Sequence, residues 1–111
     1  RGPGVLVVVA RIEGDAVGCG AIVRRAGYAE IKRMWVDPAA RGHGVGGAIL
    51  AELERLARVL GVAITRLETG IHNHDALALY ARAGYRRTGP FGDDRRDPLS
   101  VFMAKDLDRA G

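Results

Sequence analysis

The first third of the chain alternates apolar segments with turn-forming residues, a pattern that predicts β-strands. A continuous apolar run at 5–10, mostly β-branched valine, predicts a buried strand, and residues 16–24 and 28–36 predict two more. The links at 13–15 and 25–27 are short and contain glycine. We therefore expect a meander that opens with an antiparallel hairpin.

Side chains of the third strand are expected to alternate between the two faces of the sheet. A strict period of two predicts one face made of Glu30, Lys32, Met34 and Val36, and another made of Ala29, Ile31, Arg33 and Trp35.

Apolar residues then recur at helical spacing, which predicts a helix from about Gly44 to Leu60. Gly61 is placed to end this helix, and Glu54 and Arg58 have the i,i+4 spacing of an ion pair on its exposed face. The buried stripe is expected to consist of Val45, Ile49, Leu53, Leu56 and Leu60.

A further strand is predicted at 62–69, and because a helix connects it to the third strand, the two should be parallel. A shorter helix is predicted from Asp75 to Ala83, with Asp75 as its N-cap and Gly84 just after its end. The last predicted elements are strands at 85–88 and 99–104, separated by a polar loop at 89–98.

Together these elements predict an α/β fold of the α+β type, with a mixed central sheet of about six strands and two helices. A length of 111 residues is typical of a single domain. Ligands of open sheets with parallel strands collect at the carboxyl ends of strands where the topology changes. The segment after residue 36 lies at such an end.

That segment is rich in glycine and joins the end of a strand to the start of the long helix. A helix start presents free N–H groups and the positive end of the helix dipole, so it favours an anion. Without side chains, the backbone itself can approach a phosphate. The glycines in question are Gly42, Gly44, Gly46 and Gly47.

Three other interpretations of this loop are possible. A nucleotide triphosphatase loop would end in Gly-Lys-Ser/Thr, whereas this one ends in Gly46-Gly47-Ala48. A dinucleotide-binding loop would need an acidic residue at the end of the next strand. Glu68 is suitably spaced for this, but a meander precedes the loop where that fold has its first strand. The third interpretation is a turn that packs a helix closely on a sheet.

Composition and charge limit the partners and the cellular location that we expect. Seventeen Lys and Arg residues against thirteen Asp and Glu give a net charge of +4, but the basic residues occur as scattered pairs, so we expect no nucleic-acid partner. No apolar run has the length of a membrane span, so we expect no membrane partner. The single cysteine, Cys19, cannot form an intrachain disulfide, which favours a cytoplasmic location.

Two segments resemble the signature motifs of the GNAT family of N-acetyltransferases. Val36-Asp37-Pro38 followed by the Arg-Gly-His-Gly-Val-Gly of residues 41–46 resembles the family's Arg/Gln-x-x-Gly-x-Gly/Ala motif. Residues 73–85 resemble its second motif, which has Asn, a small residue, Leu-Tyr and then Gly followed by an aromatic residue. The resemblance extends from about Tyr28 to Tyr85 and implies the GNAT fold.

The resemblance implies that acetyl-CoA binds as co-substrate and that an amine accepts the acetyl group. The loop amides would hold the pyrophosphate, and the end of the third strand would bind the pantetheine arm in a gap where that strand splays from the next. The residues assigned to cofactor binding on this basis are Met34, Trp35, Val36, Arg41, Gly42, His43, Gly44, Val45, Gly46, Gly47, Asn73, Ala76 and Tyr80.

Tyr80 and Glu30 are the first candidates for catalysis. Direct transfer needs a deprotonated amine and a proton for the departing thiolate. Tyr80 is the candidate general acid, and Glu30 is the candidate base, with His72 as a competing base. Structural alternatives are a packed aromatic ring for Tyr80 and an ion pair with Lys32 or Arg66 for Glu30. We expect no metal site, because no further ligand lies near His72 and His74.

The chain begins at the opening hairpin, whereas members of the family usually carry a strand and two helices before it. We therefore expect a single GNAT domain over residues 1–111 that lacks these elements, either because it is N-terminally incomplete, or because another chain supplies them, or because it is a compact variant. An alternative to the enzyme is a non-catalytic acyl-CoA-binding module of the same fold. The sequence does not identify the acceptor amine, which can belong to a small molecule or a peptide. Exposed hairpins at a sheet edge are compatible with a homodimer.

Overall fold

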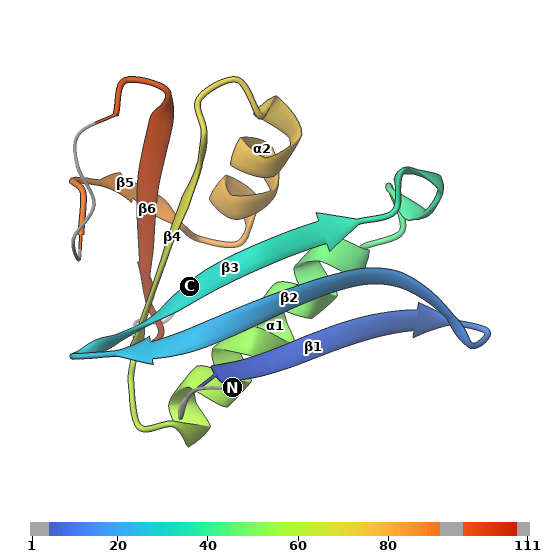
Figure 1. Ribbon diagram of the computed structural model, residues 1–111, viewed down its shortest axis with the longest axis horizontal. Coiled ribbons are helices and arrows are strands. Elements are labelled where there is room, and N and C mark those ends of the chain that lie inside the picture. Colours follow the sequence, from blue (N-terminus) through green and yellow to red (C-terminus); the bar gives the residue numbers. More distant parts are fainter. Residues whose placement is uncertain (1–4, 92–96, 109–111) are drawn as a thin grey trace.

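The computed structural model describes residues 5–91 and 97–108, which form one mixed β-sheet and two α-helices (Figure 1). The six strands lie in the order β1-β2-β3-β4-β6-β5, and this arrangement confirms the predicted fold class. In chain order the elements are β1 (Val5–Ile12), β2 (Asp15–Arg25), β3 (Tyr28–Val36), the 3₁₀ turn η1 (Pro38–Ala40), α1 (Val45–Val59), β4 (Ile64–Gly70), α2 (His74–Arg82), β5 (Arg86–Thr88) and β6 (Ser100–Asp106).

The predicted parallel pair is present but short. β3 and β4 pair only from Ala29 with Thr65 to Ile31 with Leu67, and all other strand pairs are antiparallel. Beyond these positions β3 continues beside β2, and β4 continues beside β6. The two strands therefore diverge toward their C-terminal ends, as Figure 1 shows.

A β-bulge interrupts β3. Arg33 has a φ of 57°, and the register with β2 shifts between Cys19 and Ala21. A bulge inserts one extra residue, so the side chains after it point to the opposite face from the one that a period of two predicts.

The predicted grouping of side chains on β3 is therefore wrong. Glu30 and Lys32 lie on the face away from α1, as expected for neighbours of the core residue Ile31. Met34 and Val36 instead pack against the core on the α1 side. A strict alternation cannot anticipate a bulge, because the extra residue carries no distinctive sequence signal at Arg33.

β1 is an edge strand with one open face, so the prediction of a buried strand is also wrong. Val7 is 66% exposed and Val9 is 47% exposed, whereas the alternate residues Leu6 and Val8 pack against the core. A continuous apolar run is compatible with burial on both faces, but nothing in the described part of the chain covers the outer face of β1.

Helix α1 crosses one face of β1, β2 and β3 and forms the core with them (Figure 1). Ile49 and Leu53 are fully buried over β2, where Gly18 and Gly20 leave room for them. The predicted stripe is buried at Val45, Ile49 and Leu53, with Leu56 and Leu60 only partly buried at its edge.

The predicted ion pair between Glu54 and Arg58 is absent. The Glu54 carboxylate instead accepts hydrogen bonds from Lys105 Nζ and Tyr85 Oη, both at 2.9 Å. Arg58 donates to the backbone oxygen of Leu107. Glu54 and Arg58 therefore interact with residues that are distant in sequence, and they do not pair with each other.

The helix ends are mostly as predicted. Gly61 and Gly84 follow α1 and α2 with φ of 84° and 99°, the left-handed conformation that ends helices. The predicted N-cap of α2 is wrong, because Asn73 and not Asp75 caps it. The last two strands begin one residue later than predicted, at Arg86 and Ser100, and residues 92–96 of the predicted polar loop lie outside the described residues.

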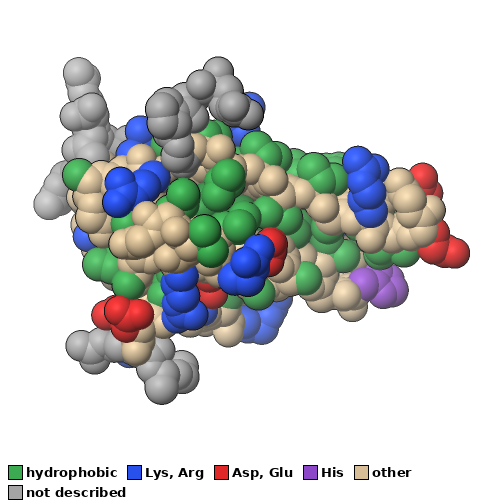
Figure 2. Space-filling model, turned by 90° about the horizontal axis from the view of Figure 1, so that it is seen from below, with side chains coloured by type: hydrophobic (Ala, Val, Ile, Leu, Met, Phe, Trp, Pro, Cys, Tyr) green, Lys and Arg blue, Asp and Glu red, His purple; other side chains and the backbone are tan. Residues whose placement is uncertain are grey.

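Charged side chains on the face shown in Figure 2 are spread among apolar ones. Lysine and arginine side chains do not gather there into one continuous basic surface.

The close contact of α1 with β2 generates a first prediction. A methyl group at Gly20 would lie 2.7 Å from Met34 Sδ and 2.9 Å from both Ile49 Cγ2 and Leu53 Cδ1. Gly20→Ala is therefore expected to lower the free energy of unfolding by about 1–3 kcal/mol, measured by urea denaturation. Gly89→Ala is the control, because nothing lies within 4 Å of a methyl group there. Equal stability of the two variants would contradict this packing.

Candidate active site

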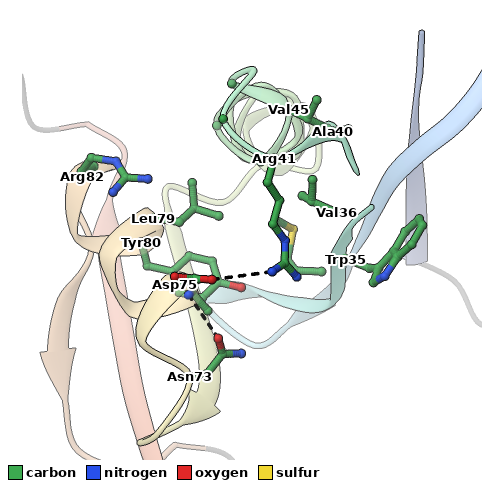
Figure 3. Close-up of a pocket in the computed structure, with 16 residues that line it drawn as sticks. Trp35, Val36, Ala40, Arg41, Val45, Asn73, Asp75, Leu79, Tyr80 and Arg82 are labelled. Carbon is green, nitrogen blue, oxygen red and sulfur yellow. Dashed lines mark hydrogen bonds and ion pairs between the residues drawn. The ribbon is translucent and has the colours of Figure 1, made fainter. Parts of the chain in front are cut away.

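A cavity of about 510 Å³ opens where β3 and β4 diverge (Figure 3). Its walls come from the end of β3, the glycine-containing loop, the first turn of α1 and one side of α2. The lining residues are Met34, Trp35, Val36, Ala40, Arg41, Gly42, Gly44, Val45, Gly46, Gly47, Asn73, Asp75, Ala76, Leu79, Tyr80 and Arg82.

The cavity brings together nearly all residues that the sequence assigned to cofactor binding. His43 is the exception, since it does not line the cavity. Glu30 also lies outside it. Residues that sequence analysis did not select, but that the cavity includes, are Ala40, Asp75, Leu79 and Arg82.

The first turn of α1 presents free backbone amides to the cavity. Gly44 is the N-cap residue, with φ of 76° and no side-chain capping bond. The helical hydrogen bonds begin only when Ala48 donates to the Gly44 carbonyl at 3.0 Å. The preceding amides of α1 are therefore available to an anion, and no side chain of the glycines stands in the way.

Gly46 also lets α2 approach α1. A methyl group there would lie 2.8 Å from Leu79 Cδ2 and 3.6 Å from Val36 Cγ2. The absence of a side chain at Gly46 thus has two uses, since it exposes the backbone and it allows α2 to form the opposite wall of the cavity.

At its N-terminus, α2 is held by Asn73, whose side-chain oxygen accepts a hydrogen bond from the Ala76 amide at 3.2 Å. Asp75 then follows in the first turn and faces Arg41 across the cavity, with 3.6 Å between Arg41 Nη1 and Asp75 Oδ2 (Figure 3). Both side chains are more than half exposed, so this ion pair contributes little to stability. It does place a cation inside the cavity.

Tyr80 projects from α2 into the cavity (Figure 3). Its ring is buried and packs edge-on against Tyr85, with 6.0 Å between ring centroids. Its hydroxyl forms no hydrogen bond with any described residue. Burial raises the pKa of the Tyr80 phenol above its ordinary value of 10.0, so the hydroxyl keeps its proton at neutral pH.

Glu30 is engaged with two cations. Its Oε1 accepts hydrogen bonds from Arg25 at 2.9 and 3.1 Å, and its Oε2 lies 3.6 Å from Lys32 Nζ. The expected pairing with Lys32 is present, whereas the expected alternative with Arg66 is replaced by Arg25. The Arg66 Nε atom is buried without a hydrogen-bond partner, while its guanidinium lies 5.0 Å from the centre of the Tyr28 ring.

Glu68 is a second carboxylate beside the divergence of β3 and β4. It follows Leu67, the last residue of β4 that pairs with β3, and lies on the face away from α1. It accepts a hydrogen bond from Ser100 Oγ at 2.6 Å and is exposed. Sequence analysis considered Glu68 only for a dinucleotide site, because its position beside the opening depends on where strand pairing stops.

Comparison with known proteins identifies the family. The family model described as "Acetyltransferase (GNAT) domain" matches residues 3–87. The chain belongs to the GNAT family of acetyltransferases. The predicted family and enzyme class are thereby confirmed.

The matches to two similar proteins extend over most of the chain. An IAA acetyltransferase of Azospirillum brasilense is 45% identical over 107 residues, which are 95% of this chain and 70% of that protein. The crystal structure of a candidate acyl-CoA N-acyltransferase from Klebsiella pneumoniae is 48% identical with a TM-score of 0.91, and the match covers 94% of this GNAT chain and 73% of the other.

A more distant structure shares the fold. The PaiA N-acetyltransferase of Thermoplasma acidophilum, solved in complex with coenzyme A, has a TM-score of 0.82 at 20% identity. The match covers 93% of this chain and 61% of that one. None of these comparisons supports the alternative of a non-catalytic binding module.

Neither described helix is long and apolar enough to cross a membrane. Within residues 5–91 and 97–108, no group of three or more His, Cys, Asp or Glu side chains is placed to hold a metal ion.

Proposed function

We propose that this GNAT protein transfers the acetyl group of acetyl-CoA directly to a primary amine of a small molecule or peptide. One observation carries the proposal: free amides at the N-terminus of α1, unpaired backbone at the end of β3 and the Tyr80 hydroxyl all meet in one cavity. An anion site alone would account only for the first of these features.

The amides from Gly42 to Gly47 are proposed to bind the pyrophosphate of CoA. The helix dipole of α1 and the Arg41 guanidinium both favour this anion. The negative charge of Asp75 opposes the binding of this anion, but the Asp75 carboxylate is paired with Arg41 and is highly exposed. When Arg41 turns toward a phosphate, Asp75 can move into solvent at little cost.

The pantetheine arm is proposed to lie along the end of β3. From Lys32 onward, the edge of β3 that faces β4 has no strand partner among the described residues, while its other edge stays paired with β2. The amide and carbonyl groups of Met34 and Val36 can therefore form hydrogen bonds with the amides of the arm. The arm would then take the place of a neighbouring β-strand. Trp35, with its side chain half exposed, lies between them.

Tyr80 is proposed as the general acid. Its hydroxyl reaches the cavity from the side of α2, whereas the pantetheine arm would approach from β3, so the thioester sulfur would lie between them. The raised pKa keeps the phenol protonated until the thiolate departs and takes the proton. No covalent enzyme intermediate is needed, because the acceptor amine attacks the thioester carbonyl directly.

The base is proposed to be a carboxylate on the sheet face away from α1. Glu30 was selected from the sequence, and its role as base stays a prediction. Arg25 donates hydrogen bonds to Oε1, and Lys32 Nζ lies 3.6 Å from Oε2. Because Glu30 does not line the cavity, a water molecule would relay the proton. Glu68 lies nearer to the point where β3 and β4 separate and is exposed, which makes it the alternative.

The acceptor itself, a cytoplasmic location and a homodimer also stay predictions. The GNAT domain and the N-acyltransferase name of the Klebsiella pneumoniae structure support amine acetylation as the reaction, but they do not select one amine for this chain.

The proposal predicts that acetyl-CoA binds and is turned over. Acetyl-CoA at 100 times its Kd is expected to stabilise the protein by about 2.7 kcal/mol, measured as a thermal shift, and ATP is expected to have no effect. With a panel of amines, at least one should release free CoA faster than a no-amine control. A lack of stabilisation by acetyl-CoA and CoA would overturn the proposal, and binding without any amine-dependent release would favour a binding module.

A second prediction concerns the acid. Tyr80→Phe is expected to lower kcat about 100- to 10,000-fold while the Kd for acetyl-CoA changes little, because only the proton donor is lost. In the wild type, the alkaline loss of activity from ionisation of Tyr80 is expected above pH 10, since burial raises its pKa above 10.0.

The control for this measurement is Tyr85→Phe. Tyr85 lies beside Tyr80, but its hydroxyl bonds to Thr65 and Glu54 and does not reach the cavity. This variant should lose stability and keep its kcat. A Tyr80→Phe enzyme with wild-type kcat would show that Tyr80 is only a packed ring.

A further inference from the structure

Arg66 is a partly buried arginine of β4 that has no anionic partner. Its buried Nε atom lacks a hydrogen-bond partner, and the side chain forms no hydrogen bond or ion pair with any described residue. The guanidinium lies 5.0 Å from the centre of the Tyr28 ring and 5.6 Å from the centre of the Phe91 ring. Arginine side chains that are withdrawn from water are normally paired with an anion. Arg66 is therefore available to an anionic ligand.

Arg66 lies beside the point where β3 and β4 separate. It pairs in register with Glu30, one position before the last pair, which is Ile31 with Leu67. Glu68 follows two residues later and lies on the same face of β4, away from α1. Two positions along a strand span about 6.6 Å. Arg66 is thus next to both carboxylates that are candidates for the base, whichever of them takes the proton.

The charges around Arg66 suit a ligand that carries both an amine and an anionic group. Glu30 is already matched by Arg25 and Lys32. Glu68 forms no ion pair with any described residue. Glu68 and Arg66 are therefore a carboxylate and a guanidinium, two residues apart on one face, that have no ionic partner in the described part of the chain.

We infer that the acceptor is a small amino acid, whose carboxylate binds the Arg66 guanidinium while its amine lies at the base. The inference rests on the proposed function, because it takes the amine to be acetylated where β3 and β4 separate. A planar guanidinium can form two parallel hydrogen bonds with a carboxylate. The rings of Tyr28 and Phe91 support the guanidinium from the side of the sheet. A peptide N-terminus does not fit, because an amide replaces the carboxylate next to its amine.

The assignment leaves the proposed reaction unchanged. The amine nitrogen forms a bond with the acetyl carbon, and the carbon–sulfur bond of the thioester breaks. The base takes the proton that the amine loses, and the departing thiolate takes the proton of Tyr80. Arg66 takes part in no proton transfer. Because it binds the carboxylate only, its loss is expected to raise KM more than it lowers kcat.

The test measures CoA release with a panel of amino acids, each compared with the matching amide, in which the carboxylate is replaced by an uncharged group. The amine of an amino-acid amide loses its proton more readily, so a preference for the acid cannot come from the amine itself. The kcat/KM of the wild type is expected to be about 10- to 100-fold higher for its best amino acid than for the matching amide, as for a hydrogen bond to a charged group.

Arg66→Gln is expected to remove this preference through a higher KM for the amino acid, so that acid and amide are used about equally well. Arg66→Lys should keep part of the preference, because it retains the charge without the planar fork. Arg86→Gln is the matched control, since Arg86 is exposed, lies on the same face through its pairing with Ala104, and lines no described cavity. An unchanged Kd for acetyl-CoA in all three variants shows that they fold.

The outcomes separate the inference from the proposed function. Amides that the wild type uses as well as the acids would overturn the inference and leave the proposed function intact. An equal loss for acid and amide in Arg66→Gln would show that the arginine only supports the aromatic rings, and would also overturn it. A preference for aminomethylphosphonate over every amino acid would contradict the carboxylate. Binding of acetyl-CoA without release by any amine would overturn the proposed transfer itself.

Discussion

The structure depends on the point at which β3 and β4 stop pairing. Up to Ile31 and Leu67 they form an ordinary parallel ladder, and beyond it they separate while their outer edges remain paired. An open ladder costs free energy, because backbone amides and carbonyls lose their partners. The opening is held by α1 and α2, which meet at Gly46 and Leu79 and form the walls of the cavity. A ligand with its own amides can satisfy the open edge.

The bulge at Arg33 determines which residues face this opening. By turning Met34 and Val36 toward α1, it places their side chains in the cavity wall and under the helix. Glu30 and Lys32, just before the bulge, stay on the opposite face. One extra residue in β3 thus separates the proposed cofactor side of the sheet from the side on which an amine and its base would meet.

Much of the fold and of the cavity could be predicted from the sequence, because these features depend on local sequence patterns. The glycines before α1, and the motif from Asn73 to Tyr85, are contiguous patterns whose spacing reflects one turn or one helix. Most of the residues selected from these patterns line one cavity, and their role in cofactor binding stays a prediction. The mixed sheet also followed from connection lengths alone.

What the sequence did not predict depends on long-range contacts. The partner of Glu54 is Lys105 on β6. The pairing of Glu30 with Arg25, which replaces the expected alternative Arg66, is set by how β2 lies beside β3. The roles of Arg82 and Asp75 as cavity residues depend on the approach of α2 to α1, which has no local signal. Likewise, the exposure of Val7 and Val9 follows from the place of β1 at the sheet edge.

We propose that one cavity binds CoA through the amides of the α1 N-terminus and the open edge of β3. The most direct measurement is the change in backbone amide resonances on titration with CoA. The largest shifts are expected at Gly44, Gly46 and Gly47 and at Met34 and Val36, with little change in β1. Shifts confined to other parts of the chain, or none at saturating CoA, would contradict it.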